Sequence, residues 1–106
     1  MAVTAKVLVP AKTAEATQTS QYIADGVTTI IDKFTATNYS ASAATLSVNL
    51  ITATFSAANS NLIVKARTLA AGETYIFPEI VGSAILAGGY ISTICGAAAS
   101  VTIRAS

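Results

Sequence analysis

Apolar and polar residues alternate along several short stretches of the chain, and the clearest stretch covers residues 44–52. There Leu46, Val48 and Leu50 fall on one side of an extended chain, with polar residues between them. A period of two residues is typical of a β-strand that buries one face. A similar alternation runs over Asn61–Leu69. Both segments are therefore predicted to be strands.

Shorter stretches with the same character, separated by Gly, Asn, Ser and Asp, predict the remaining strands. They cover Val3–Val9, Gln18–Ile23, Val27–Asn38, Thr74–Phe77, Tyr90–Cys95 and Ser100–Arg104. Pro10 is expected to end the first strand, and residues 11–19 to form a polar connection. In the third, Ile30, Phe34 and Ala36 share the expected inner face, and Asp32 either breaks that row or marks a bulge.

Seven or eight short antiparallel strands, with a turn every eight to twelve residues, predict a single all-β domain. The expected architecture is an antiparallel β-sandwich, jelly-roll-like in its connections. Residues 17–106 are assigned to this sandwich. Residues 1–16 are assigned either to an N-terminal arm or to the first strand of the domain.

Charge is scarce along the whole chain, and this narrows the possible functions. Only 10% of the residues are charged and the net charge is +1, against about 25% charged residues in ordinary soluble domains. Without a basic stripe, the electrostatic requirement for nucleic-acid binding is not met. A nearly uncharged surface has little colloidal repulsion, so the composition favours a protein that associates with itself or with a partner.

The residue types that usually carry catalysis are missing or isolated. There is no histidine, Cys95 is the single cysteine, and the five carboxylates are scattered. No catalytic triad, metal site or cofactor site is predicted from these residues, and the chain is interpreted as non-enzymatic. Cys95 is expected to be a small buried hydrophobic residue, and Gly88-Gly89 a turn that needs positive φ.

A membrane span is the main alternative reading of the second half of the chain. Residues 80–103 carry no charge over a length that would cross a bilayer. Four glycines and five serines or threonines interrupt this run, and no cluster of Lys or Arg flanks it. No membrane association is therefore expected, although a small holin-like membrane protein stays an alternative.

Several motifs resemble those of small β-sandwich proteins in the virions of tailed bacteriophages. The motifs are Tyr22–Ile31 (YIADGVTTII), Ala36–Asn38, Leu46–Val48, Leu69–Thr74 (LAAGET) before Phe77-Pro78, and Leu86–Ile91 (LAGGYI). In that group an acidic residue commonly follows the glycine of the last motif, where this chain has Gly89. The resemblance covers roughly residues 18–105.

This resemblance implies a structural component of the virion, assembled in the host cytoplasm. The leading expectation is a capsid decoration (cement) protein, homotrimeric, whose partners are further copies of itself and the major capsid protein. A head–tail or tail adaptor, or a host-contact protein, is the alternative within virions. A carbohydrate-binding module is an alternative of another class.

Two groups of residues are candidates for the interface. The first lies in the arm, where an extended segment is suited to add a strand to a neighbouring sheet edge. The second consists of aromatic residues in predicted loops, which are plausible interface anchors. The candidate residues are Val3, Lys6, Val7, Leu8 and Val9 in the arm, and Tyr39 and Phe55 in the loops. For the arm, the competing interpretation is that it forms this domain's own first strand.

Overall fold

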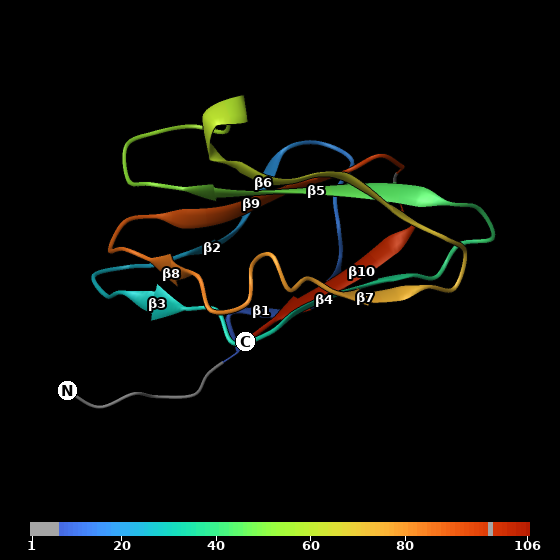
Figure 1. Ribbon diagram of the computed structural model, residues 1–106, viewed down its shortest axis with the longest axis horizontal. Helices are drawn as coiled ribbons and strands as arrows, with labels where there is room; N and C mark the ends of the chain where they lie inside the picture. Colours follow the sequence, from blue (N-terminus) through green and yellow to red (C-terminus); the bar gives the residue numbers. More distant parts are fainter. Residues whose placement is uncertain (1–6, 98) are drawn as a thin grey trace.

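A computed structural model describes residues 7–97 and 99–106, which form an all-β sandwich (Figure 1). Within these ranges the strands are β1 (Val9–Thr13), β2 (Thr19–Ile23), β3 (Thr29–Ile30), β4 (Phe34–Asn38), β5 (Ala44–Ile51), β6 (Leu62–Leu69), β7 (Thr74–Ile76), β8 (Ala84–Ile85), β9 (Tyr90–Cys95) and β10 (Val101–Ala105). A 3-10 turn, η1 (Asn59–Asn61), precedes β6. The predicted fold class, an antiparallel β-sandwich, is confirmed.

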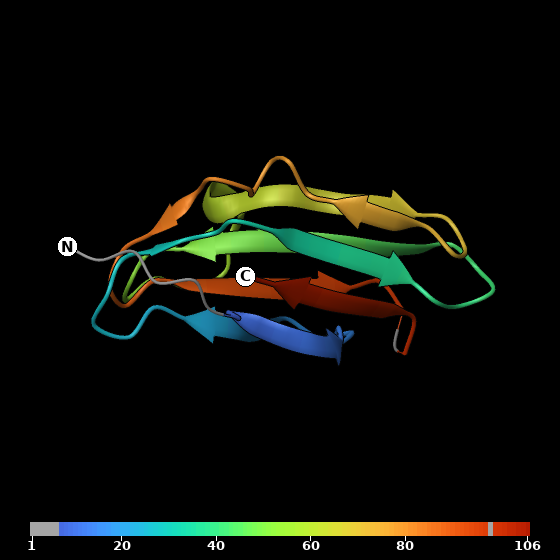
Figure 2. The same cartoon turned by 90° about the horizontal axis from the view of Figure 1, so that it is seen from below.

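Two four-stranded sheets form the layers of the sandwich. One sheet has the order β1-β10-β4-β7 and the other β2-β9-β5-β6, with every neighbouring pair antiparallel. A two-stranded ribbon of β3 and β8 lies at one end of the long axis (Figures 1 and 2). The edge strands are β1 and β7 in the first sheet, and β2 and β6 in the second.

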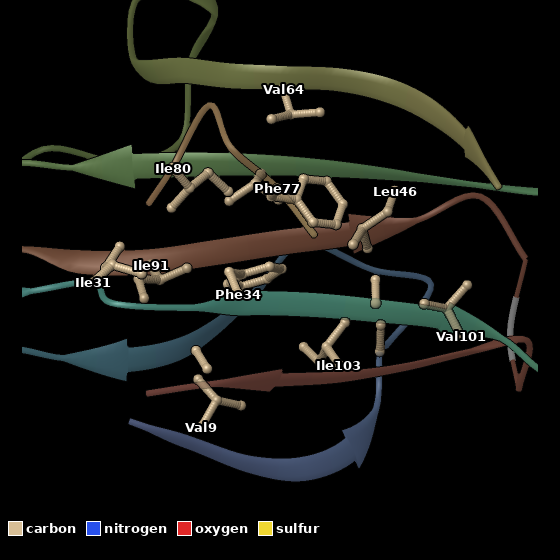
Figure 3. Close-up of a cluster of buried hydrophobic side chains, with 14 of the residues drawn as sticks. Val9, Ile31, Phe34, Leu46, Val64, Phe77, Ile80, Ile91, Val101 and Ile103 are labelled. Carbon is tan, nitrogen blue, oxygen red and sulfur yellow. The ribbon is translucent and has the colours of Figure 1, made fainter. Parts of the chain in front are cut away.

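The core lies between the two sheets and is built from large apolar side chains of both (Figure 3). Phe34 and Phe77 are fully buried, and their rings meet edge to face with centroids 5.2 Å apart. This is a favourable arrangement for aromatic pairs. Cys95 is buried among these residues as expected. The inner position predicted for Phe34 is therefore confirmed, and Phe77 packs against it in the core.

The predicted single strand over residues 27–38 is wrong, because the chain changes partner in the middle. Residues 29–30 pair with β8, residues 34–38 pair with β10 and β7, and residues 31–33 belong to neither. This break restarts the two-residue alternation. As a result Ile30, expected on the inner face, is 63% exposed, and Ile31 is fully buried in its place.

The first strand also differs from its prediction. It begins at Val9 and passes through Pro10, the residue expected to end it; residues 3–6 of the predicted strand lie outside the described residues. Proline is tolerated here because β1 is an edge strand that pairs only with β10, and its register shifts between Val9 and Lys12. A bulged edge does not need the backbone N–H that proline lacks.

The alternation predicted for residues 44–52 and 61–69 needs two corrections. Asn49 lies on the outer face of β5, yet it is only 3% exposed, because the loop before β6 folds back over it. Its side-chain amide donates to Ala58 O at 3.1 Å and to Asn61 Oδ1 at 2.7 Å. In β6, Ala66 is exposed rather than inward. It sits at a register shift with φ +46°, and its N–H donates to Ser47 Oγ at 2.7 Å.

Candidate interaction surface

The described part of the N-terminal segment belongs to the domain itself. Leu8 and Val9 are buried in the core, and the Leu8 N–H donates to Ala105 O at 3.0 Å. Val7 is about half exposed. The other two candidates in this segment, Val3 and Lys6, lie outside the described residues. Leu8 and Val9 therefore pack in this molecule's own core.

The two loop aromatics are both exposed but do not come together. Tyr39 follows β4, and Phe55 follows β5. The eight residues of β5 separate their loops, a length of about 26 Å at the usual rise per residue. Residues 39–43 accordingly lie at one end of the sandwich, and residues 52–58 at the other (Figures 1 and 2). They belong to two different surfaces.

The end that carries Tyr39 is organised around a buried polar side chain. Asn38 is fully buried, and its side-chain amide donates to Ser42 O at 2.8 Å and to Leu69 O at 2.9 Å. Its Oδ1 accepts from the N–H and the hydroxyl of Ser40. The backbone of Asn38 also accepts from Gly72 N at 2.8 Å. We call residues 38–43 and 70–73 the polar end.

At the opposite end, five large apolar side chains project outward. They are Ile23, Val27, Ile30, Phe55 and Leu86, each between 50% and 66% exposed. We call these five residues the apolar end. Among them, only Phe55 was predicted from the sequence as an interface residue. Ile23 and Ile30 were assigned to strands, where an apolar residue is expected to face the core, so the alternation pattern gave no sign of their exposure.

Backbone contacts hold the three loops of the apolar end together. The Ala24 N–H donates to Gly89 O at 2.8 Å, and the Gly88 N–H donates to Ala24 O at 2.6 Å. Gly88 has φ +86°, and a Cβ built on it would lie 2.8 Å from the Cβ of Ala53. The turn at Gly88-Gly89 therefore needs positive φ, as predicted, and also a close approach to a neighbouring loop that only glycine permits.

Strand pairing places the exposed side chains on two adjoining faces. Ile23 and Ile51 both pair with Tyr90, so the three side chains form a row on the outer face of one sheet. In this row Ile23 is exposed and Ile51 is buried. The Tyr90 hydroxyl donates to Phe55 O at 2.8 Å, which fixes the Phe55 loop beside this row.

The second face belongs to the β3–β8 ribbon. Thr29 pairs with Ile85, and Ile30 pairs with Ala84. The Thr29 hydroxyl hydrogen-bonds to Tyr22 Oη at 2.8 Å, and both Thr29 and Ile85 are buried. Because side chains alternate along a strand, Ile30 must point away from the core. Its exposure is a consequence of the ribbon's pairing.

Two groups of charged side chains lie beside the edge strands. Lys12 and Glu15 form an ion pair of 2.8 Å beside β1. The hydrogen bond from Lys12, together with one from Gln21, lowers the pKa of Glu15. In contrast, the apolar end is built from segments that contain a single charged residue, Asp25. These segments are residues 23–30, 51–58 and 84–90.

On the opposite side, edge strands of the two sheets meet through an aromatic side chain. The Arg67 guanidinium lies 4.0 Å from the centroid of the Tyr75 ring. The Tyr75 hydroxyl donates to Glu79 Oε2 at 2.9 Å, and this hydrogen bond raises the pKa of Tyr75. The Tyr75 ring packs edge to face on Phe77 with centroids 4.7 Å apart. These contacts link β6 to β7.

A shallow polar depression lies on the outer face of the second sheet. It is lined by Gln18, Ser47, Asn49, Ala57, Ala58, Asn59, Leu62, Lys65 and Ile94. None of these residues is aromatic, so the depression offers no ring on which a sugar would stack. Gln18 donates to Ser92 Oγ at 2.7 Å, so part of the lining is already engaged within the protein. The depression gives little support to a carbohydrate site.

In the part of the chain that the structure describes, residues 7–97 and 99–106, no cluster of metal-ligating side chains comes together: no three side chains of His, Cys, Asp or Glu gather where they would hold a metal ion. The same residues contain no helix with the length and apolar character needed to span a bilayer. The Cys95 thiol is buried and donates to Ala97 O at 3.1 Å. The apolar end is therefore the best candidate for a functional surface.

Comparison with known proteins adds no relative to this picture. No protein-family model, curated protein or solved structure matches the chain. The resemblance to phage virion proteins consequently stays a prediction from sequence motifs.

Proposed function

We propose that this chain is a non-enzymatic structural protein of a phage virion, most simply a capsid decoration (cement) protein. One observation carries the proposal: half of the ten large hydrophobic residues that the described part of the chain exposes lie at a single end. Large apolar side chains concentrated on a monomer's surface are typical of a site for association. The motifs that resemble virion proteins give the class of assembly.

The proposed mechanism is mechanical. Each copy buries apolar surface against the shell, which contributes about 25 cal/mol per Å² before the cost of association is subtracted. A sandwich with tied loops loses little conformational entropy on docking, because the contacts that fix those loops are already formed. If the copies also contact one another, as in a homotrimer, their linked contacts give a higher avidity for the shell than one copy has. Reinforcement then needs no chemical step.

Within virions, a head–tail or tail adaptor would use the same kind of surface. The number of copies in each particle separates the two roles. A cement protein is expected in hundreds of copies, and an adaptor in about a dozen or fewer.

The test is quantitative gel or mass-spectrometric analysis of purified particles of the phage whose genome encodes this chain. Absence of the protein from washed particles would overturn the proposal, and a low copy number would favour the adaptor.

A further inference from the structure

We infer that the apolar end docks onto an apolar protein surface that carries a basic side chain, with Asp25 of this chain facing that group. The inference rests on the proposed function, since the shell would supply this surface. It adds the docking face and the chemistry of the partner, which the proposed function leaves open.

The geometry of the end argues against a symmetric dimer as its purpose. The two shorter dimensions of the molecule are 27 and 19 Å, so a flat contact across the end covers about 500 Å² of each partner. A stable protein–protein interface buries about 800 Å² on each partner. Two copies joined end to end would therefore associate weakly. A shell that holds many copies at fixed positions does not need a large contact for each copy.

The charge of the apolar end also argues against a symmetric dimer. Asp25 is exposed in the turn between β2 and β3, next to Gly26 with φ +70°. Among the described residues Asp25 has no ion-pair partner. A twofold contact across this end would bring two Asp25 carboxylates to one interface, and an anionic lipid surface would repel the same group. A Lys or Arg on a partner protein complements it.

The five apolar residues are also presented on a fixed frame. The Gly82 N–H donates to Ile31 O at 2.7 Å, and the Ile31 N–H donates to Ser83 O at 3.0 Å, so the ribbon is tied to the chain before β8. Together with the bonds between Ala24 and the Gly88-Gly89 turn, these contacts set the positions of Ile30 and Leu86. A surface formed before binding suits a partner of fixed shape.

The experiment uses purified shells that lack this protein and measures binding of the full chain by co-sedimentation. Leu86→Asp is compared with Ile76→Asp, because the two side chains are 64% and 62% exposed and Ile76 lies on β7, outside the apolar end. We expect Leu86→Asp to weaken binding more than about tenfold, as for the loss of a central apolar anchor. Ile76→Asp should bind within about twofold of the unchanged protein. Circular dichroism confirms that both variants fold.

The charge is tested on the same shells. Asp25→Asn is expected to weaken binding about two- to fivefold, and Asp25→Lys more, with the difference shrinking as salt is raised. Glu79→Gln, on the side of the molecule, is the matched control and should leave binding unchanged. Tighter binding of Asp25→Lys would show an acidic partner and overturn the inference.

The outcomes separate the two proposals. If the unchanged protein fails to bind shells, the proposed function fails. If it binds and Leu86→Asp binds equally well, the function stands and the docking face is wrong. A dimer in sedimentation velocity that Leu86→Asp abolishes would assign the end to a second copy. Binding to phosphatidylcholine vesicles that the same variant abolishes would assign it to a membrane, and either result would overturn the inference.

Discussion

The loops at the two ends of this sandwich are held in place by different kinds of hydrogen bond. At the polar end, the Asn38 side chain replaces missing backbone partners, and the loops close on themselves through polar contacts. At the apolar end, backbone groups pair directly with one another between loops, and the side chains are left outside. Apolar groups kept in water do not stabilise the fold. Under the proposed function, the polar end serves stability and the apolar end serves association.

The largest expected effect comes from removing β1, which lies on the side of the molecule and belongs to neither end. Deleting residues 1–16 takes away β1 and the buried Leu8 and Val9, so we expect loss of cooperative unfolding in urea. Deleting residues 1–6 removes no contact described above and is the control. Full stability of the longer deletion would show that the segment is a separable arm rather than part of the domain.

The next largest effect is expected at the polar end. Asn38→Ala leaves the carbonyl oxygens of Ser42 and Leu69 without their donor, and should lower the free energy of unfolding by about 2–4 kcal/mol. Tyr39→Ala, next to it but exposed, should change that free energy by less than about 0.5 kcal/mol. Urea denaturation measures both. Equal effects would mean that the buried amide is not what holds this end.

A smaller loss is expected where the loops of the apolar end meet. Gly88→Ala meets the Cβ of Ala53 at 2.8 Å and also disfavours the φ of +86°, which we expect to cost about 2 kcal/mol. Gly26→Ala has a similar φ but open space around it, and should cost about 1 kcal/mol. If the two variants lose the same stability, the contact between the loops does not contribute.

The exposed side chains of the apolar end should contribute almost nothing to folding. Phe55→Ser and Leu86→Ser are each expected to change the free energy of unfolding by less than about 0.5 kcal/mol. Both should reduce retention on a hydrophobic-interaction column, which reports exposed apolar surface. A large loss of stability would mean that these residues pack within the protein, and would remove the contrast between the ends.

A further small effect is expected on the side of the molecule between the ends. Because the pKa of Glu15 is lowered in the folded state, its contribution to stability is present above its ordinary value of 4.5 and is lost as pH falls through the folded value. The pair with Lys12 is well exposed, so solvent screens it and the contribution stays below about 1 kcal/mol. Glu15→Gln should flatten the dependence of stability on pH below 5, as followed by urea denaturation.

Much of the fold could be predicted from the sequence because the strands are short and their alternation is local. Residues 44–52 and 90–95 were placed almost to the residue, and the buried position of Phe34 followed from the same pattern. The apolar end could not be found this way. The alternation pattern predicts that a strand residue such as Ile30 faces the core. Only the pairing of Ile30 with Ala84 shows that its side chain points to solvent.

The sequence by itself determined that the chain is all-β, poor in charge and without the residues of common catalytic sites, since these follow from residue types and a period of two. The tertiary structure decided which apolar residues remain in water, because exposure depends on which strand each residue pairs with. It also decided that the loops of Tyr39 and Phe55 are held apart by the length of β5, and that Leu8 and Val9 belong to the core. Those outcomes depend on contacts between residues far apart in the chain, which local pattern does not encode.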